Sequence, residues 1–347
     1  MLGEHGLLGA IRAHVRGAAN GPRNWGEALR LGIGDDAAIV STAKDEEIVV
    51  TTDFSLEDVH FRREWHTPES VGHRCLARGL SDVAAMGSRP VAAFLSMALP
   101  EELVAARRGT SWMERFFDGF LALAKQYDVP LAGGDTAQAV DRACFDVVVL
   151  GAVKRGRAWL RSGAKAGDLI YVTGALGGAA AELMALERSP RRFARLTKAM
   201  DRHPHLYPNP RLDVAKKLAA SRLVRAAIDV SDGLSTDLTH ICEESGLSAE
   251  VDASAIPVHR MAMEAEHRGW AASAMELAFN GGEDYELLFT AAPEMRVPRR
   301  VAGVKIHQVG RMVRKKTRGP LVMLKDEDGR VRALEARGWQ HFRKDSH

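Results

Sequence analysis

The segment Leu31–Val40 (LGIGDDAAIV) constrains the chain most, because two carboxylates lie on a loop of small residues directly before an apolar strand. Aspartates beside glycines suit Mg²⁺, which takes hard oxygen ligands and keeps several waters. Ordinary turn chemistry explains the same residues, since Asp bonds its own backbone and Gly accepts positive φ. A dinucleotide-binding fingerprint is excluded, because a strand and not a helix follows the glycines.

Length and composition are those of an ordinary globular protein. The 347 residues favour two domains, and 46% hydrophobic with 27% charged residues is enough for two buried cores. A net charge of +3 is too small to indicate nucleic acid as a partner. Three widely spaced cysteines, no signal peptide and no apolar run of membrane-spanning length predict a cytoplasmic protein without a membrane partner.

Strand and helix patterns alternate along the chain and predict an α/β (α+β) fold. In the first half we expect strands at 45–53, 91–99 and 145–154, and helices at 68–86 and 101–127. In the second half we expect strands at 168–174 and 226–232, and helices at 175–187 and 234–244. The basic, glycine-containing segment 156–167 is typical of a connection, which predicts domains at 1–155 and 156–347.

Acidic residues recur after apolar runs, beside Gly, Ser or Thr. They are Asp36, Asp53, Asp82, Asp135, Asp229 and Asp232. Helix caps and exposed polar positions explain each of them singly, but gathered carboxylates repel one another unless cations lie between them. Both halves are therefore expected to contribute to a site with several Mg²⁺ ions. The motifs of the usual nucleophilic enzymes and protein kinases are absent, and phosphoryl transfer needs only positioning and charge neutralisation.

Four segments leave alternatives open. The Gly177-Gly178 turn either cradles phosphate on backbone N–H groups or allows close packing of strand and helix. Phe279–Phe289 (FNGGEDYELLF) contains either a site carboxylate or an Asn-Gly hairpin turn. For His60 and the terminal aromatic residues of RGWQHF, surface exposure and ordinary tail packing are the simpler interpretations from these residues alone.

Nine motifs then resemble one family in order over essentially the whole chain. They are GIGDDAAI, TTDFSLEDVHF, LSDVAAMG, LAGGDT, LRSGAKAGD, YVTG, AIDVSDGLSTDL, NGGEDYELLFT and GWQHF. The family is that of the thiamine-monophosphate kinases, within the aminoimidazole ribonucleotide synthetase-like superfamily. The resemblance implies a two-domain fold and a homodimer built through the N-terminal sheets. It also implies Mg²⁺-assisted in-line transfer from ATP to thiamine monophosphate, which yields thiamine diphosphate.

The resemblance also implies a role for individual residues. Metal ligands fall on Asp36, Thr51, Thr52, Asp53, Asp82, Asp135, Asp229 and Asp232, with Asp53 and Asp135 as the essential Mg²⁺-positioning acids. ATP contacts fall on Gly134, Asp135, Arg161 and Ser231, and substrate contacts on His60, Glu283 and Trp339. No general base is assigned, because the attacking phosphate oxygen of the acceptor is already deprotonated near neutral pH.

Two departures and several rivals bear on this interpretation. Asp58 stands where the family commonly has Gly, and Gln340 replaces a more usual acid. A selenophosphate synthetase would carry a reactive Cys near its N-terminus, but the first cysteine is Cys75. The hydrogenase-maturation relatives end in Cys, whereas this chain ends Lys-Asp-Ser-His. A purine-precursor synthetase and a non-catalytic nucleotide-binding relative remain as alternatives.

Overall fold

The computed structural model describes residues 29–31, 39–40, 42–105, 110–193, 203–315, 319–326 and 328–338, so Asp36, Trp339 and Gln340 lie outside the described residues. The chain divides into two compact units, and both units are discontinuous in sequence. The first comprises Met1–Val83, Ser88–Arg157 and Leu186–Asn209, and the second comprises Ala84–Gly87, Ala158–Ala185 and Pro210–His347. The first unit thus includes a segment from well beyond the boundary expected near residue 155.

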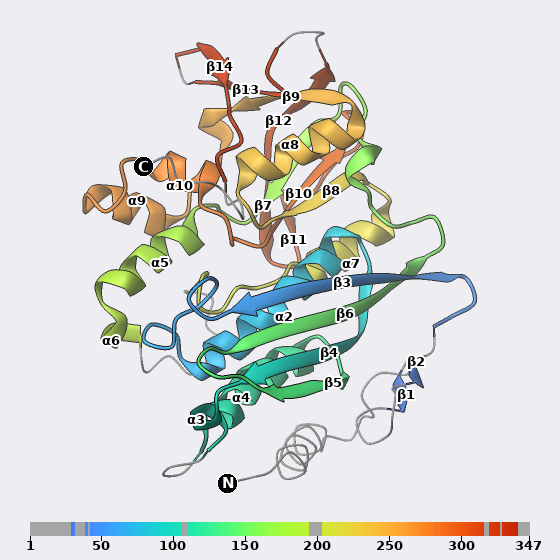
Figure 1. The fold of residues 1–347 in the computed structure, drawn as a ribbon. Coiled ribbons are helices and arrows are strands. Elements are labelled where there is room, and N and C mark those ends of the chain that lie inside the picture. Colours follow the sequence, from blue (N-terminus) through green and yellow to red (C-terminus); the bar gives the residue numbers. More distant parts are fainter. Residues whose placement is uncertain are drawn as a thin grey trace. The chain divides into compact units, whose positions relative to one another are not determined.

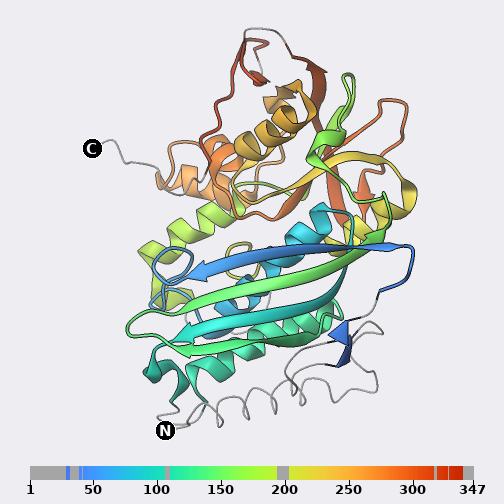
Figure 2. The same ribbon diagram turned by 45° about the vertical axis from the view of Figure 1, so that its right-hand side comes forward.

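A four-stranded sheet forms the centre of the first unit (Figures 1 and 2). Its strand order is β3 (Glu46–Leu56), β6 (Cys144–Lys154), β4 (Arg89–Leu99) and β5 (Leu131–Gln138). The pairs β3–β6 and β4–β6 are antiparallel, whereas β4–β5 is parallel. A short antiparallel pair, β1 (Leu29–Leu31) with β2 (Ile39–Val40), precedes it in the chain.

Two helices cover one face of this sheet, α2 (Pro68–Ala85) and α4 (Trp112–Gln126) (Figure 1). The predicted apolar face of α2 is confirmed, because Val71, Cys75, Leu76 and Leu80 are all buried. The helices cross closely where a Cβ atom on Gly119 would overlap with the Glu69 carbonyl group of α2. Aromatic side chains fill the space between α4 and the sheet, with the Phe116 and Phe145 rings stacked at 4.4 Å.

Two sequence predictions in this unit are wrong in extent. The helix expected at 101–127 is two helices, α3 (Glu101–Val104) and α4, because the Ser111 side chain and Glu114 form a capping box that starts a new helix. The strand expected to end at Asp53 continues to Leu56, so Thr51, Thr52 and Asp53 lie in the middle of β3 and not at its carboxyl end.

The second unit is built on an eight-stranded, largely antiparallel sheet (Figure 1). Its strands are β7 (Leu169–Thr173), β8 (Val224–Val230), β9 (Leu247–Asp252), β10 (Glu286–Ala291), β11 (Arg300–Val301), β12 (Val304–Arg314), β13 (Val322–Lys325) and β14 (Val331–Ala333). The order is β14-β13-β9-β12-β7-β10-β8, with β11 beside β12. Since β8 and β10 pair antiparallel with Asp229 opposite Leu287, the segments before β10 and after β8 lie at the same end of the sheet.

The helices along the second half are α5 (Gly178–Arg188), α6 (Pro190–Phe193), α7 (Leu212–Ser221), α8 (Leu234–Ser245), α9 (Arg260–His267) and α10 (Ala274–Asn280), with short 3₁₀ turns at Arg161–Gly163 and Ala253–Ala255. The apolar side of α8, with Leu238 and Ile241, joins Ile170 and Ile228 of the sheet in one buried cluster. The hairpin alternative for residues 279–289 is wrong, because Asn280 ends α10 and Gly281 is its C-cap.

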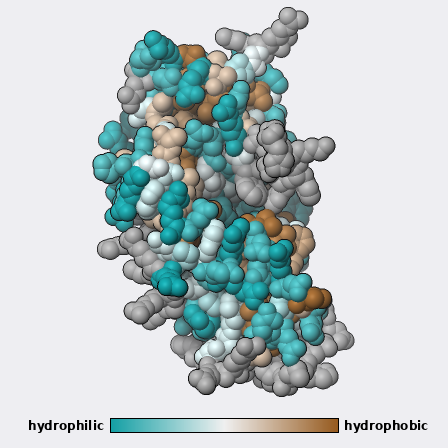
Figure 3. All heavy atoms as spheres, turned by 60° about the vertical axis from the view of Figure 1, so that its left-hand side comes forward, coloured by the Kyte–Doolittle hydropathy of each residue, from teal (hydrophilic) through white to brown (hydrophobic). Residues whose placement is uncertain are grey.

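The surface view in Figure 3 is mostly hydrophilic, with hydrophobic residues in small, separate patches. Among the described residues, none of the helices combines the length and apolarity needed to cross a bilayer. The three cysteines are free thiols, with Cys75 and Cys242 buried.

The segment 203–209 packs on α2 within the first unit through a buried set of polar contacts. His73 on α2 donates from Nε2 to the Pro208 carbonyl oxygen at 2.7 Å, and its ring meets Tyr207 edge-on at 5.2 Å. Burial lowers the pKa of His73 from 6.5 to about 4, so the imidazole is neutral in the folded protein at neutral pH.

Replacement of His73 should therefore change the acid stability of the protein. The unfolded chain binds this proton below pH 6.5, whereas the folded chain binds it only below about pH 4. The free energy of unfolding is therefore roughly 3 kcal/mol higher above pH 6.5 than it is once the pH has fallen to 4. His73→Gln keeps the donor to Pro208 and should flatten that part of the urea-unfolding pH profile. Identical slopes for variant and wild type would contradict the assignment.

Candidate functional site

The side chains of β3 alternate between the helix-covered face of the sheet and the opposite face. The Thr51 hydroxyl donates to the Asp82 carboxylate on α2, so Thr51 lies on the helix-covered face. The Thr52 hydroxyl instead donates to Asp146 Oδ1 on β6 at 2.6 Å. Adjacent residues of one strand therefore serve two different faces, and Asp53 follows Thr51 on the side of α2.

Asp53 has an electrostatic environment that a cation would relieve. Its Oδ1 lies 3.6 Å from Arg78 Nη2, and its buried Oδ2 accepts no hydrogen bond. Burial of the carboxyl group and the neighbouring Asp82 raise the pKa of Asp53 to about 6, although Arg78 acts to lower it. A buried oxygen without a donor calls for an explanation, and an ion is one of the standard ones.

The chemistry of these donors fits Mg²⁺. Thr51, Asp53 and Asp82 offer hydroxyl and carboxylate oxygens, the hard ligands that this ion takes. Within the described ranges, no three or more His, Cys, Asp or Glu side chains form a group able to hold a metal ion. The described residues of the first unit therefore do not by themselves form a complete ligand set, and Asp36 lies outside the described residues.

Gly134 and Asp135 lie in a strand, β5. Gly134 has φ +152°, and a Cβ atom there would overlap with the Leu95 carbonyl group, so only glycine fits this close strand approach. Asp135 is opposite Ser96 on β4, and Ser96 is opposite Asp146 on β6, so Asp135 shares the exposed face with Asp146. The structure therefore places Asp53 and Asp135 on opposite faces of one sheet.

His60 lies in the turn after β3, and its ring orientation is set by the backbone. The Leu56 N–H group donates to His60 Nδ1 at 3.0 Å, so this nitrogen keeps its lone pair and Nε2 carries the proton. Arg74 on α2 holds the turn from the other side, since its Nη2 donates to the His60 carbonyl oxygen at 3.3 Å. The turn thus presents a neutral imidazole with one N–H donor.

Asp58, the first departure from the family pattern, lies in the same turn with φ +67°. Glycine, the residue expected here from the family resemblance, would adopt this left-handed conformation freely, whereas L-residues with a Cβ atom adopt it at a cost. The added negative charge is matched by Arg142, whose Nε lies 2.7 Å from Asp58 Oδ2. The departure is thus accommodated by local backbone tolerance of Asp and by a surface ion pair.

In the second unit, Asp229 and Asp232 flank the end of β8, and the structure adds a third carboxylate that sequence analysis missed. Asp237 is buried in the first turn of α8, where its Oδ2 accepts from Asp232 N at 3.2 Å and Gly233 N at 3.1 Å. Burial, Asp229 and Asp232 raise the pKa of Asp237 well above its ordinary value. The sequence signal that could have identified Asp237 is its place in the run DGLSTDL, which begins with Asp232.

Two further segments close on Ser231 and Asp232. Glu283 N donates to the Ser231 carbonyl oxygen at 2.7 Å, and a Cβ atom on Gly338 would overlap with the Asp232 carbonyl group. Gly338 N also donates to Thr236 Oγ1 at 3.1 Å, which fixes the chain one residue before Trp339. Predicted site segments that are far apart in sequence therefore meet at one end of this sheet.

The backbone around Glu283 is strained. Gly282, Glu283 and Tyr285 have φ values of +68°, +57° and +50°, and the last two are not glycine. Such conformations cost about 1–3 kcal/mol each and are kept where the surrounding structure enforces them, often at functional sites. The strained backbone includes Glu283, which the family resemblance assigns as a contact of the substrate.

The phosphate-cradle alternative for Gly177-Gly178 is not supported. The buried Asp284 carboxylate accepts from Gly177 N at 2.6 Å and from Ala179 N at 3.1 Å, so a side chain already occupies the N-terminus of α5. A Cβ atom on Gly177 would also crowd Ala278 on α10 at 2.8 Å. Close packing therefore explains the glycines, and burial raises the pKa of Asp284 to about 7.

Arg161 lies in the 3₁₀ turn Arg161–Gly163 with an exposed side chain, and its carbonyl oxygen accepts from Ser245 Oγ at 2.7 Å. Its backbone is thus anchored to the end of α8. Among the predicted site residues, Asp36 and Trp339 lie outside the described residues.

Comparison with protein families assigns the class of this fold and site. Residues 34–153 match the family model "AIR synthase related protein, N-terminal domain", and residues 165–320 match "AIR synthase related protein, C-terminal domain". Together the two models span most of the chain, so it is an AIR synthase related protein with both domains of that class.

Similarity to individual proteins shows to which family within the AIR synthase related class the chain belongs. The chain is 35% identical over 323 residues to the thiamine-monophosphate kinase of Bacillus subtilis (strain 168), covering 91% of this chain and 94% of that protein. It belongs to the thiamine-monophosphate kinase family. The crystal structure of the thiamine-monophosphate kinase from Stenotrophomonas maltophilia K279a aligns with a TM-score of 0.74 at 36% identity, over 92% of this chain and 96% of that one. AaThiL complexed with AMPPCP and TMP aligns with a TM-score of 0.72 at 29% identity, over 98% and 97%.

The left-handed conformation of Asp58 leads to a prediction about the free energy of unfolding of variants at this position. Asp58→Gly should leave the free energy of unfolding unchanged or raise it by up to about 1 kcal/mol, because glycine removes the cost of positive φ. Asp58→Val should lower it by about 1–2 kcal/mol. Asp141→Gly, at an exposed position without positive φ, is the matched control and should be destabilising. Urea unfolding checks all three, and equal losses at positions 58 and 141 would contradict the prediction.

Proposed function

We propose that this protein transfers the terminal phosphoryl group of ATP to thiamine monophosphate and so forms thiamine diphosphate. The observation that carries the proposal is the similarity to thiamine-monophosphate kinases over nearly the whole chain. The acidic groups support it, since a set of carboxylates without a nucleophile suits phosphoryl transfer, in which positioning and charge neutralisation dominate.

Donor and acceptor are both polyanions, so their mutual repulsion is the main obstacle to reaction. In our proposal, Thr51, Asp53 and Asp82 hold Mg²⁺ in the first unit together with Asp36, and Asp229 and Asp232 do so in the second. The Thr52 hydroxyl lies on the opposite face of the sheet, so its proposed role as a ligand belongs, like that of Asp135, to that face. Bound Mg²⁺ supplies charge neutralisation of the phosphates. Gly134, Arg161 and Ser231 are proposed ATP contacts, and His60, Glu283 and Trp339 are proposed contacts of the thiamine substrate.

The residues of the chain position the acceptor and do not activate it. A phosphate oxygen of the acceptor is already anionic near neutral pH, so attack needs no general base. The N–H group of His60 Nε2 suits an anionic or acceptor atom of the substrate, and the strained Glu283 backbone holds a carboxylate for its cationic part. The proposed location is the cytoplasm, which fits three free thiols, two of them buried.

An activity assay tests the proposal. Purified protein with ATP, Mg²⁺ and thiamine monophosphate should form thiamine diphosphate, and a parallel reaction with the purine precursor should give no product. Asp53→Asn should lower kcat by about 100-fold or more, on the scale of a preorganised electrostatic contact. Asp141→Asn, an exposed acid, is the control. Mg²⁺-dependent ATP binding without turnover by the wild type would instead indicate a non-catalytic relative.

We further propose that the protein is a homodimer that pairs through the exposed face of the first unit's sheet. Ile48, Val50 and Phe54 of β3 lie on this face with 46%, 61% and 57% of their area exposed, which is unusual for a strand. Asp135 lies on the same face, separated by its own sheet from Asp53. We therefore propose that Asp135 positions Mg²⁺ in a site that forms only when two protomers pair through this face.

The oligomeric state tests this surface. Wild-type protein should elute as a dimer in size-exclusion chromatography with light scattering, and Val50→Glu should give a folded monomer because it buries a charge in the interface. Val140→Glu is the matched control, since Val140 is 91% exposed in a loop of the same unit. A monomeric wild type, or a dimeric Val50→Glu variant, would exclude this interface.

A further inference from the structure

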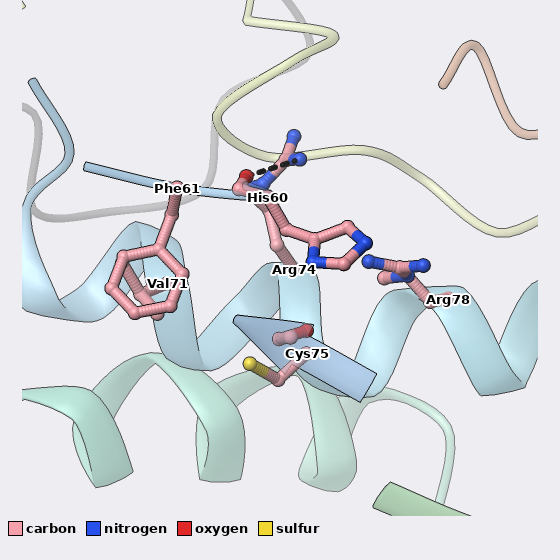
Figure 4. A pocket seen from close by; sticks show the side chains of 7 residues that line it. His60, Phe61, Val71, Arg74, Cys75 and Arg78 are labelled. Carbon is pink, nitrogen blue, oxygen red and sulfur yellow. Dashed lines mark hydrogen bonds between the residues drawn. The ribbon is translucent and has the colours of Figure 1, made fainter. Parts of the chain in front are cut away.

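Two segments with proposed substrate contacts are held through their backbone by polar side chains of a neighbouring helix. In the first unit, Arg74 on α2 donates to the carbonyl oxygen of His60 at 3.3 Å (Figure 4). In the second unit, the side chains are the hydroxyl groups of Ser235 and Thr236, which lie in the first turn of α8 with 0% and 5% of their area exposed. Buried hydroxyl groups normally bond within the protein, so their partners show what this turn holds.

Both hydroxyl groups bond to the C-terminal segment. Ser235 Oγ accepts from Arg337 N at 3.4 Å, and Thr236 Oγ1 accepts from Gly338 N at 3.1 Å. Adjacent residues of one helix turn thus take up two consecutive backbone donors from a segment 102 positions further along the chain. The next residue is Trp339, a proposed contact of the thiamine substrate. The two hydroxyl groups therefore fix the chain up to the residue before Trp339.

Gly338 lets this segment lie directly on the turn before α8. A Cβ atom at Gly338 would overlap with the Asp232 carbonyl group and would lie 2.6 Å from Thr236 Oγ1, so no other residue fits here without displacement. Asp232 is a proposed Mg²⁺ ligand, and Ser231 beside it is a proposed contact of ATP. The docked segment therefore lies against the turn that carries both residues.

Ser235 also connects this segment with the one that carries Glu283. Its hydroxyl group donates to Asn280 Oδ1 at 2.6 Å, and Asn280 ends α10 three residues before Glu283. A hydroxyl group can donate one hydrogen bond while it accepts others, so both contacts of Ser235 coexist. One side chain thereby touches the two segments of this unit that lead to proposed contacts of the thiamine substrate.

We propose that Ser235 and Thr236 are positioning residues that dock the C-terminal segment on α8 and so hold Trp339 within reach of the thiamine substrate. Neither side chain touches the substrate in this proposal. The docking follows from the contacts of the described residues, whereas its role in substrate binding rests on the proposed function. Because coupling between two binding events is reciprocal, a substrate that uses the docked segment also strengthens the docking.

Limited proteolysis with trypsin tests the docking without catalysis. Trypsin cleaves after Arg337, whose side chain is 60% exposed but whose backbone N–H group donates to Ser235. The segment must leave α8 before the protease can accept it, so the cleavage rate follows the undocked fraction. Thr236→Val should raise this rate by about tenfold, because it removes one buried acceptor and keeps the shape of the side chain. Mass spectrometry of the product that ends at Arg337 gives the rate.

Three further variants separate docking from a general loss of stability. Thr236→Ser keeps the acceptor and should be cleaved at the wild-type rate. Thr239→Val is the matched control on α8, since the Thr239 hydroxyl donates to the Ser235 carbonyl oxygen within the helix at 2.7 Å, and its cleavage rate should be unchanged. Gly338→Ala displaces the segment without altering α8, so it should raise the rate even if Thr236→Val folds poorly. Unchanged cleavage of both Gly338→Ala and Thr236→Val would overturn the docking.

Binding of the thiamine substrate tests the positioning role. Thiamine monophosphate without ATP should slow the cleavage of the wild type after Arg337 several-fold. Thr236→Val should raise the KM for thiamine monophosphate by about fivefold and leave the KM for ATP unchanged, a split that a general loss of stability would not produce. Faster cleavage with an unchanged KM for thiamine monophosphate would overturn the positioning role. An inactive wild type would refute the proposed function alone, because cleavage in the absence of ligands still tests the docking.

Discussion

Repulsion between neighbouring carboxylates is the interaction on which the organisation of this protein depends. Asp53 lies beside Asp82 in the first unit, and Asp237 lies with Asp229 and Asp232 in the second. The Arg78 guanidinium lies beside the first group, and two backbone N–H groups donate to Asp237 in the second. Burial and the neighbouring carboxylates raise the pKa values of Asp53 and Asp237, and a bound cation would lower the repulsion in each group.

Strand alternation gives the first unit two functional faces. Thr51 and Asp53 point toward α2, where the Asp82 carboxylate lies, while Thr52 points to the face that carries Asp146 and exposed apolar residues. A single strand, β3, thereby connects the face that carries Asp53 and Asp82 with the face proposed for dimerisation. Substitutions on the two faces are expected to separate chemistry from assembly, because neighbouring side chains share a backbone but no environment.

Backbone geometry, more than side-chain chemistry, arranges the second unit's site. Gly338 allows the C-terminal segment to approach Asp232, and Glu283 is held in a left-handed conformation against Ser231. The Asp284 carboxylate takes up the backbone donors of the α5 N-terminus, which removes the phosphate position that the glycines suggested. Glycines in this unit thus permit close contacts and do not by themselves mark ligand sites.

The sequence by itself determined the family, the alternation of strands and helices and the buried face of α2, because these follow from local periodicity and from motifs that stand in order. Only the tertiary structure decided that Asp135 and Asp53 lie on opposite faces, that Asp237 joins the second acidic group, and that Arg78 is the partner of Asp53. Local pattern sets which way a side chain points along its own element. Which groups it meets there depends on strand register and on contacts between residues far apart in the chain, and these have no local signature.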